Sequence, residues 1–313
     1  MRLITDISEL QQRPLPPSVA TIGFFDGVHR GHRFLIGQVM QAARKHSLNS
    51  LIVTFPHHPR AVMQASYQPS LLSAFDEKCS LLSDTGVDAC ASIPFTRELA
   101  LLSARDFMQH VLRDLLNVRL LVIGHDHRFG HNRAEGFNDY LRHAAGLGME
   151  VIQAEAYKWE GRNVSSSVVR TLLNEGKVSE AANCLGYNYM LTGHVTGGQQ
   201  IGRTMGFPTA NLQVDNTLKL IPADGAYAVY VRTDGSCYKG MLNIGCRPTI
   251  ENGSHRTIEV HLFDFNGNLY GQRLCIEFVH RIRGEQKFPS REALATQLKA
   301  DAEEAIRRLK DNI

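Results

Sequence analysis

The sequence predicts two domains, an N-terminal α/β domain with a parallel sheet and a smaller C-terminal antiparallel β-barrel that ends in a helix. A chain of 313 residues is long for a single hydrophobic core. As far as about residue 186, short apolar runs alternate with longer stretches of helical period, which is typical of strand–helix–strand units. After Tyr187 the pattern changes to strict alternation with glycine-containing turns. We therefore expect the domains to cover residues 1–186 and 187–313.

The elements of the first domain follow from its apolar runs. Buried-type strands are expected at residues 19–22, 51–55, 120–124 and 149–152, with a helix over residues 34–46. Runs without polar alternation are typical of strands covered on both faces, as in a parallel sheet. Ligands of such sheets bind at the carboxyl ends of the strands.

The second domain is predicted from alternating strands and one amphipathic helix. Residues 226–231 and 257–262 alternate apolar with polar or small side chains, as strands of a small barrel do. The closing helix is expected to begin after Ser290, a good N-cap residue. Its apolar face is formed by Leu294, Leu298, Ala305 and Leu309.

Composition limits the possible partners. Lys and Arg together number 34 and Asp and Glu 31, so the net charge of +3 gives no reason to expect nucleic acid. No run approaches the ~18 apolar residues of a membrane span. The cysteines have no paired spacing, so we expect free thiols in the cytoplasm. They are Cys79, Cys90, Cys184, Cys237, Cys246 and Cys275. The oligomeric state is not indicated.

The strongest motif of the first domain is TIGFFDGVHRGH, residues 21–32. A strand runs into glycines that let the backbone approach a ligand, and a helix is expected to begin where His29 and His32 lie. Residues three apart near a helix start can face the same way, so both imidazoles can donate to one polyphosphate. Such donors stabilise the charge that develops when the α-phosphorus of ATP is attacked. Further candidate phosphate-binding residues are Gly23, Phe24, Asp26 and Gly31.

Two other interpretations of the histidine pair are possible. Histidines near a helix start are often surface residues, although the glycines and the preceding strand favour the phosphate site. A metal site is also possible, but no third ligand at a supportive spacing recommends it.

Three later segments are expected to return to the same edge of the sheet. Residues 54–60 and 124–130 follow predicted strands, and residues 164–170 are typical of a helix start that suits phosphate. The candidates on the first two segments are His58, Arg60, Asp126 and Arg128. Those on the third are Ser166, Ser167 and Arg170.

The second site begins with a glycine-rich stretch, GGQQIGRT, at residues 197–204. It resembles a P-loop, but residues 205–208 (MGFP) prevent the helix that a P-loop requires. We expect instead a flap that brings backbone amides, a hydroxyl and an amide oxygen to a nucleotide phosphate and its metal. The candidates are Gly202, Arg203, Gly206, Pro208, Thr209 and Asn211. A simple loop between barrel strands is the alternative.

On these motifs the first half resembles the nucleotidyltransferases of the HxGH class, which implies a Rossmann-like fold. The whole chain resembles the bacterial bifunctional riboflavin kinases and FMN adenylyltransferases, also called FAD synthetases. Two stretches depart from the family pattern. The family commonly has Asp-Phe-Arg-Phe-Gly where residues 126–130 have His127 in second place, and a Gly-Asp soon after Arg133 is replaced by residues 134–137 (AEGF).

The resemblance implies a function for each domain. Residues 187–313 would phosphorylate riboflavin and residues 1–186 would adenylate the resulting FMN to FAD, each step consuming ATP with Mg²⁺. Thr209 and Asn211 would hold Mg-ATP, and Glu259 would take the proton from the ribityl 5′-hydroxyl. His58, Arg60, Asp126 and Arg128 would lie on the FMN side of the first site. Alternation at residues 258–260 turns Glu259 away from its apolar neighbours, although a solvent-facing glutamate is the alternative.

Two competing functions remain open. The N-terminal domain could act alone on another phosphate ester, such as a pantetheine or nicotinamide precursor. Alternatively, one half could be a regulatory module that binds FMN without turnover. The complete kinase pattern argues against the first, and His29, His32, Thr209, Asn211 and Glu259 together argue against the second.

Overall fold

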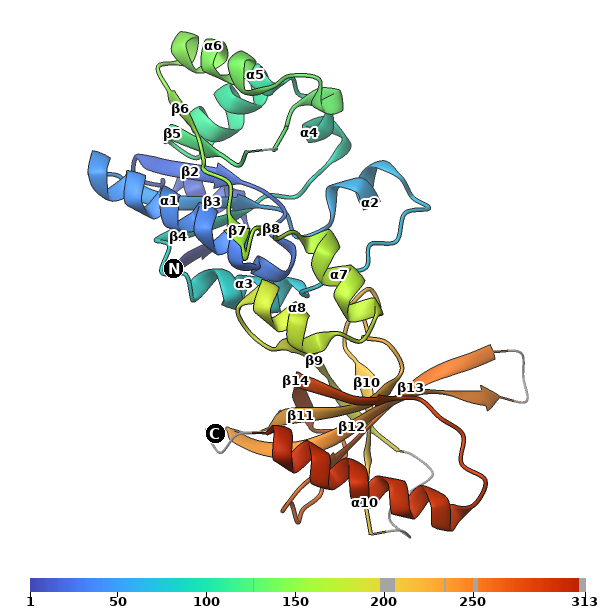
Figure 1. Ribbon diagram of the computed structural model, residues 1–313. Coiled ribbons are helices and arrows are strands. Elements are labelled where there is room, and N and C mark those ends of the chain that lie inside the picture. Colours follow the sequence, from blue (N-terminus) through green and yellow to red (C-terminus); the bar gives the residue numbers. More distant parts are fainter. Residues whose placement is uncertain (126, 198–205, 234, 250–252, 310–313) are drawn as a thin grey trace. The chain divides into compact units, whose positions relative to one another are not determined.

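The computed structural model describes residues 1–125, 127–197, 206–233, 235–249 and 253–309 (Figure 1). The chain forms two compact units, Met1–Ser165 and Ser166–Ile313. The segment between residues 166 and 186, which we assigned to the first domain, is thus part of the second compact unit. Across the described ranges, no helix combines the length and apolar character needed to span a membrane.

The first unit is built on a six-stranded sheet in the order β1-β4-β3-β2-β5-β6, and every pairing is parallel. This confirms the predicted parallel sheet. The strands are β1 (Arg2–Ile4), β2 (Ser18–Ile22), β3 (Asn49–Thr54), β4 (Ala89–Ser92), β5 (Val118–Ile123) and β6 (Glu150–Gln153). The sequence analysis did not indicate β1 or β4, because β1 has only three residues and β4 (ACAS) consists of small side chains rather than a branched apolar run.

Helices cover both faces of this sheet. Alternate residues of each strand point to opposite faces, and both sets are apolar and need to be covered. On one face, Val19 and Leu120 pack against Val39 of α1 (Arg30–His46). On the other face, Ala20 and Leu121 belong to a larger cluster. That cluster includes residues of the π-helix η3 (Phe107–Leu115) and of α6 (Phe137–Leu147). The remaining helical segments of this unit are η1 (Ile7–Gln11), η2 (Asp26–Val28), α2 (Pro59–Met63), α3 (Phe75–Ser83), α4 (Arg97–Leu101), α5 (Ala104–Asp106) and η4 (His131–Arg133), and a hairpin joins β7 (Lys158–Trp159) to β8 (Arg162–Asn163).

The central strand β2 lies between β3 and β5. The chain therefore leaves β2 toward β3 on one side and returns beside it as β5 on the other. Such a switch point opens a crevice at the carboxyl ends of the two strands, where open parallel sheets bind ligands. The motif at residues 21–32 follows β2 and the loop at residues 124–130 follows β5, so both reach this crevice.

The second unit is a closed antiparallel barrel in the order β10-β13-β12-β11-β14-β9. This confirms the predicted barrel. Aromatic side chains fill part of its interior: the rings of Phe278 and Tyr227 pack edge-on, with their centroids 5.2 Å apart. The strands are β9 (Tyr189–Thr196), β10 (Ala210–Val214), β11 (Gly225–Thr233), β12 (Ser236–Thr249), β13 (Gly253–Leu262) and β14 (Arg273–Gly284).

The closing helix α10 (Arg291–Arg308) lies along the barrel (Figure 1). Ser290 caps it as predicted, because its hydroxyl accepts a hydrogen bond from the Ala293 amide at 3.1 Å. Of the predicted apolar face, Ala305 and Leu309 are buried and Leu298 packs against the same cluster. The helix thus covers the outer surface of strands β11 and β12.

Two further helices, α7 (Ser166–Asn174) and α8 (Val178–Leu185), precede the barrel. The Ser179 hydroxyl donates to the Val279 carbonyl at 2.8 Å, and the Arg281 guanidinium donates to the Glu175 carbonyl at 3.1 Å. Leu173 and Leu185 are fully buried. These contacts attach both helices to β14.

Candidate active sites

The two motif histidines stack at the start of α1. His29 is the N-cap residue, and its Nδ1 accepts a hydrogen bond from the His32 amide at 3.3 Å. The ring centroids are 3.6 Å apart and the planes differ by 17°. The expectation that both rings face the same way is confirmed. Because Nδ1 accepts, the ring proton of His29 lies on Nε2, which is therefore a donor.

The glycines of the motif are needed for this geometry. A side chain at Gly31 would begin 3.2 Å from the His29 ring and 3.3 Å from the Val164 carbonyl oxygen. Only a residue without Cβ lets the His29 ring lie over the first turn of the helix. Gly27 has a φ of 76°, in the left-handed region that favours glycine.

Asp26 holds a neighbouring loop rather than facing outward. It is 3% exposed, and its carboxylate accepts hydrogen bonds from the amides of Leu72 and Ser73 at 2.9 to 3.0 Å. The Ser73 hydroxyl in turn accepts from the Gly27 amide at 2.9 Å. These bonds favour a positioning role for Asp26, so its predicted contact with phosphate stays a prediction.

His32 lies among positive groups. Burial lowers its pKa well below the usual range, and repulsion from His29, His127 and Lys78 lowers it further. The imidazole is therefore neutral at pH 7. Its Nδ1 is buried and has no hydrogen-bond partner among the described residues.

Lys78 is a functional candidate that sequence reasoning missed. Its side chain is 2% exposed, and Nζ donates to the carbonyls of Phe24 at 3.1 Å and Phe55 at 2.7 Å. Burial lowers its pKa to about 8. The ammonium thus joins the segments that follow β2 and β3. The available signal was its helical spacing to Leu81 and Leu82, which places a lysine on the buried face of α3.

The predicted FMN-side residues are only partly brought together. His58 caps α2, and its ring lies 4.8 Å from that of Phe24, which connects this loop to the motif. The described contacts of Arg60 are with Gln64 and Tyr67 of its own segment. Arg128 lines a cavity of about 370 Å³ at the end of β5. Asp126 lies outside the described residues.

The serines and arginine of the third segment begin the second compact unit. Ser166, Ser167 and Arg170 all lie in α7, so the predicted helix start is confirmed. Their expected approach to His29 and His32 remains a prediction.

In the barrel, Glu259 faces away from the interior as predicted. Its neighbours Ile258 and Val260 are 4% and 0% exposed, whereas Glu259 is half-buried on the outer face. It pairs directly with Asn211 of β10 and with Asn243 of β12. Directly paired residues share one face of a sheet, so these three polar side chains form a row across three strands.

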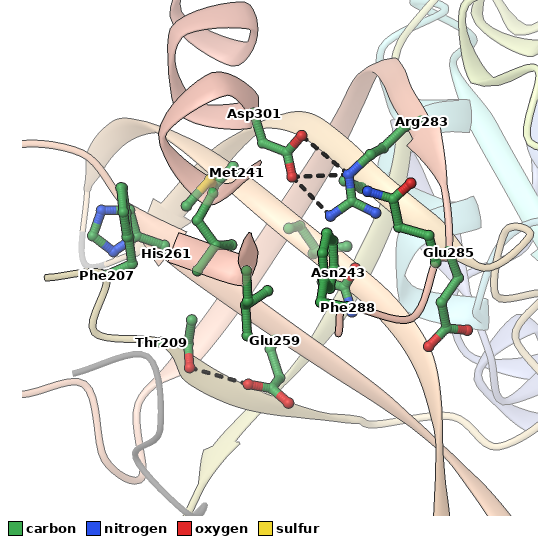
Figure 2. A pocket seen from close by; sticks show the side chains of 15 residues that line it. Phe207, Thr209, Met241, Asn243, Glu259, His261, Arg283, Glu285, Phe288 and Asp301 are labelled. Atoms are coloured by element: carbon green, nitrogen blue, oxygen red, sulfur yellow. Dashed lines mark hydrogen bonds and ion pairs between the residues drawn. The ribbon is translucent and has the colours of Figure 1, made fainter. Parts of the chain in front are cut away.

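Thr209 lines two cavities, the first of which is drawn in Figure 2. Its hydroxyl donates to Glu259 at 3.1 Å. One cavity, of about 250 Å³, contains Glu259 and the apolar side chains of Met241 and Phe288. The other cavity, of about 430 Å³, is lined by Pro208 and Ala210 on the side of Thr209 and by residues 265–267, 269 and 270. A molecule in either cavity would reach the Thr209–Glu259 pair.

The segment before β10 is held by His261, which sequence reasoning missed. The His261 ring is 2.8 Å from the Pro208 carbonyl oxygen through Nδ1, and the Phe207 ring meets it edge-on at 5.4 Å. Gly206 has a φ of 83°, as expected of a glycine turn. Gly202 and Arg203 lie outside the described residues.

A buried ion pair attaches α10 to the wall of the first cavity. The Arg283 guanidinium donates to both carboxylate oxygens of Asp301, at 2.8 to 3.1 Å, and Asp301 is 2% exposed (Figure 2). Gln297 donates to the same carboxylate at 2.8 Å. The sequence analysis assigned no role to Arg283.

The donors around Thr209 fit a magnesium ion. Thr209 and Asn211 are two apart on an extended segment, so both side chains can face one side, and Glu259 adds a carboxylate. Hydroxyl, amide and carboxylate oxygens are hard donors of the kind Mg²⁺ accepts together with substrate phosphates. Elsewhere in the described chain, no group of three or more His, Cys, Asp or Glu side chains is placed to hold a metal.

Comparison with known proteins agrees over both units. Residues 11–168 match the FAD synthetase family and residues 185–309 the riboflavin kinase family. The chain is 38% identical over 284 residues to the bifunctional riboflavin kinase/FMN adenylyltransferase of Pseudomonas fluorescens, covering 90% of both. It is 36% identical over 304 residues to that of Escherichia coli (strain K12), covering 96% of both.

A solved structure is similar over the full length. The structure of the macrolide-efflux protein from Streptococcus pneumoniae covers 98% of this chain and 99% of its own, with a TM-score of 0.88 and 32% identity. That likeness shows a shared architecture, and the two family matches with the curated relatives decide the family. The chain belongs to the bifunctional riboflavin kinases/FMN adenylyltransferases, with the FAD synthetase domain first and the riboflavin kinase domain second.

Proposed function

We propose that the two sites act in succession on one flavin. The barrel site phosphorylates riboflavin to FMN, and the histidine site transfers the adenylyl group of a second ATP to FMN, releasing pyrophosphate. The observation that carries the assignment of roles is the Thr209–Glu259 hydrogen bond at the junction of two cavities.

In the kinase step, the oxygen of the ribityl 5′-hydroxyl attacks the γ-phosphorus of ATP, and ADP leaves. Glu259 takes the proton of this hydroxyl during the attack. The apolar cavity beside Glu259 suits the flavin rings, because ligand sites combine apolar walls with few polar groups. The nucleotide occupies the cavity on the other side of Thr209. A base must lie within hydrogen-bond reach of the proton it removes, and a flavin in this cavity would bring its ribityl chain toward Glu259.

Mg²⁺ is part of this proposal. Thr209 and Asn211 would hold it, and when bound it neutralises charge on the phosphates of ATP. The residues themselves orient the ion and the hydroxyl, and Glu259 accepts the proton.

In the adenylylation step, His29 and His32 stabilise charge. An oxygen of the FMN phosphate attacks the α-phosphorus of ATP, and the bond to the leaving pyrophosphate breaks. The Nε2 proton of His29 and the amides at the start of α1 donate to phosphate oxygens at the positive end of the helix dipole. Gly23, Phe24, Gly31, Ser166, Ser167 and Arg170 are the further residues proposed to contact ATP, and Arg60, His58 and Arg128 to contact FMN.

The boundary between the activities is proposed at residue 186, and fragments can test it. A fragment of residues 187–313 would lack α7 and α8, which contain the buried Leu173 and Leu185 and, through Ser179, a hydrogen bond to β14. If riboflavin phosphorylation needs only the barrel, this fragment and one of residues 166–313 will have equal rates per folded molecule. If only the longer fragment phosphorylates riboflavin, the functional boundary moves to residue 166.

The proposed setting is the cytoplasm, with small-molecule substrates and no nucleic-acid partner. The absence of disulfides among the described cysteines supports a reducing compartment: no disulfide is formed by Cys79, Cys90, Cys184, Cys237 or Cys275.

One experiment tests the whole proposal. The full chain is incubated with riboflavin, ATP and Mg²⁺, and FMN and FAD are followed by chromatography. FMN should appear first and then convert to FAD. Flavin binding without ATP consumption would instead support a regulatory module, and FMN formation without FAD would indicate another substrate for the histidine site.

A further inference from the structure

His127 lies four residues after the end of β5 and is within electrostatic range of the motif histidine His32. Its amide closes a turn on the Gly124 carbonyl at 3.0 Å, directly after β5. Because β5 pairs with β2, this turn lies at the same switch point as the motif after β2. His127 lines the cavity of about 370 Å³ together with Arg128.

Two buried ring nitrogens near this point have no protein partner. They are Nε2 of His127 and Nδ1 of His32, and neither has a hydrogen bond among the described residues. A charge on His127 would disfavour protonation of His32, so the two side chains are within electrostatic range of each other. Buried polar atoms are normally paired, so each unpaired nitrogen calls for an explanation.

The surroundings favour an anionic ligand. Arg133 contributes a positive field at His127, and Lys78 contributes one at His32. Burial and the Arg133 charge lower the pKa of His127 to about 4, so its imidazole is neutral and can donate one N–H. An acceptor with negative charge would satisfy the buried donor and balance the nearby cations.

We propose that His127 is a third phosphate-binding histidine of the adenylyl-transfer site, donating from Nε2 to a phosphate oxygen of ATP or FMN. This inference rests on the proposed function of the first unit. The competing explanation is that His127 only fills space, since its ring also packs near Phe129 at 6.4 Å and the family pattern has phenylalanine there.

Two substitutions distinguish phosphate binding by His127 from a purely space-filling role. His127→Phe keeps the ring volume and removes the donor, whereas His127→Gln places an amide N–H near the position of Nε2. We expect His127→Phe to lower the rate of FAD formation from FMN by ~10-fold or more, and His127→Gln to restore part of it. His131→Phe, an exposed histidine on the same loop, is the matched control and should leave the rate unchanged.

Binding measurements identify which phosphate is contacted. Dissociation constants for FMN and for α,β-methylene-ATP are measured with wild type and both His127 variants. Weaker binding of only one ligand in His127→Phe names that ligand, and a lower turnover with both constants unchanged places the contact in the transition state. A wild-type rate in His127→Phe, or equal losses in the Phe and Gln variants, would overturn the inference.

A second measurement does not depend on the variants folding. In wild type labelled at the histidine rings, adding FMN or α,β-methylene-ATP should shift the NMR resonance of His127, and no shift with either ligand would refute the contact. Failure of the proposed function is recognised separately, because the wild-type protein would then make no FAD from FMN at all.

Discussion

The two sites of this chain are built in different ways. The histidine site is made of loops at the carboxyl ends of parallel strands, held by buried groups such as Asp26 and Lys78 and by backbone in left-handed conformations. The barrel site is a row of side chains, Asn211, Glu259 and Asn243, set by strand register. We infer that the first site depends on residues that never touch substrate, whereas the second can be altered one side chain at a time.

The sharpest test of this difference is Glu259→Gln. Removing a general base costs ~10²- to 10⁴-fold in rate, so FMN formation should fall by that amount. The barrel should remain folded, because a glutamine can still accept the Thr209 hydrogen bond. Adenylylation of added FMN should be unchanged, and Glu303→Gln, on the exposed side of α10, should leave both steps unchanged. Loss of both activities in Glu259→Gln would contradict the separation of the sites.

His29→Ala and His32→Ala should affect only the other step. Losing one donor of this kind costs ~10²- to 10³-fold in turnover, with a smaller effect on ATP binding because the charge develops in the transition state. His29→Ala should also destabilise α1 by ~1 kcal/mol, since it removes the N-cap. Steady-state rates of FAD formation from FMN measure the loss of turnover, and the His46→Ala variant, at an exposed position, is the control. Unchanged FAD synthesis in both variants would mean that the pair only packs and caps the start of α1.

Asp301→Asn tests how far the barrel site depends on α10. Breaking a buried ion pair costs ~3 kcal/mol or somewhat more, so the unfolding transition of the barrel unit should move to lower temperature. Calorimetry identifies that transition as the one that riboflavin shifts upward. The KM for riboflavin should rise more than kcat falls, because Arg283 and Asp301 line the cavity proposed to hold the flavin and are not assigned a part in the proton transfer. A fall in kcat at constant KM would show that the ion pair acts in the chemical step.

Lys78→Met tests the buried anchor of the histidine site through pH. The pKa of Lys78 in the folded state, about 8, lies below the ordinary value for lysine. At a pH between these two pKa values, the unfolded chain binds a proton that the folded chain does not. The free energy of unfolding should therefore rise with pH above about 8, by about 1 kcal/mol per unit at most, and Lys78→Met should lack this rise.

The single tryptophan, Trp159, lies in the first unit, so its fluorescence reports the unfolding of that unit. Burial raises the pKa of Cys90 to about 12. This shift lowers the free energy of unfolding above pH 9 in wild type and in Lys78→Met alike, so it largely cancels when the two proteins are compared. Equal slopes in wild type and Lys78→Met would mean that Lys78 titrates as an exposed lysine does.

The sequence alone determined the parts of the molecule that depend on local pattern. Apolar runs predicted the central parallel strands, alternation predicted the outward direction of Glu259, and Ser290 predicted the start of α10. The spacing of His29 and His32 predicted that they face the same way, because three residues make nearly one helical turn. Each of these features is set by residues close together in the chain.

Only the tertiary structure decided which distant residues meet. Lys78 joins two loops that follow different strands, and Asp301 meets Arg283 from another element. His127 comes within electrostatic range of His32 because β5 pairs with β2. The segment 166–186 belongs with the barrel because its apolar side chains pack there, although nothing local distinguishes it from the preceding domain. Such contacts depend on strand order and packing, and a periodic pattern within one segment carries no information about either.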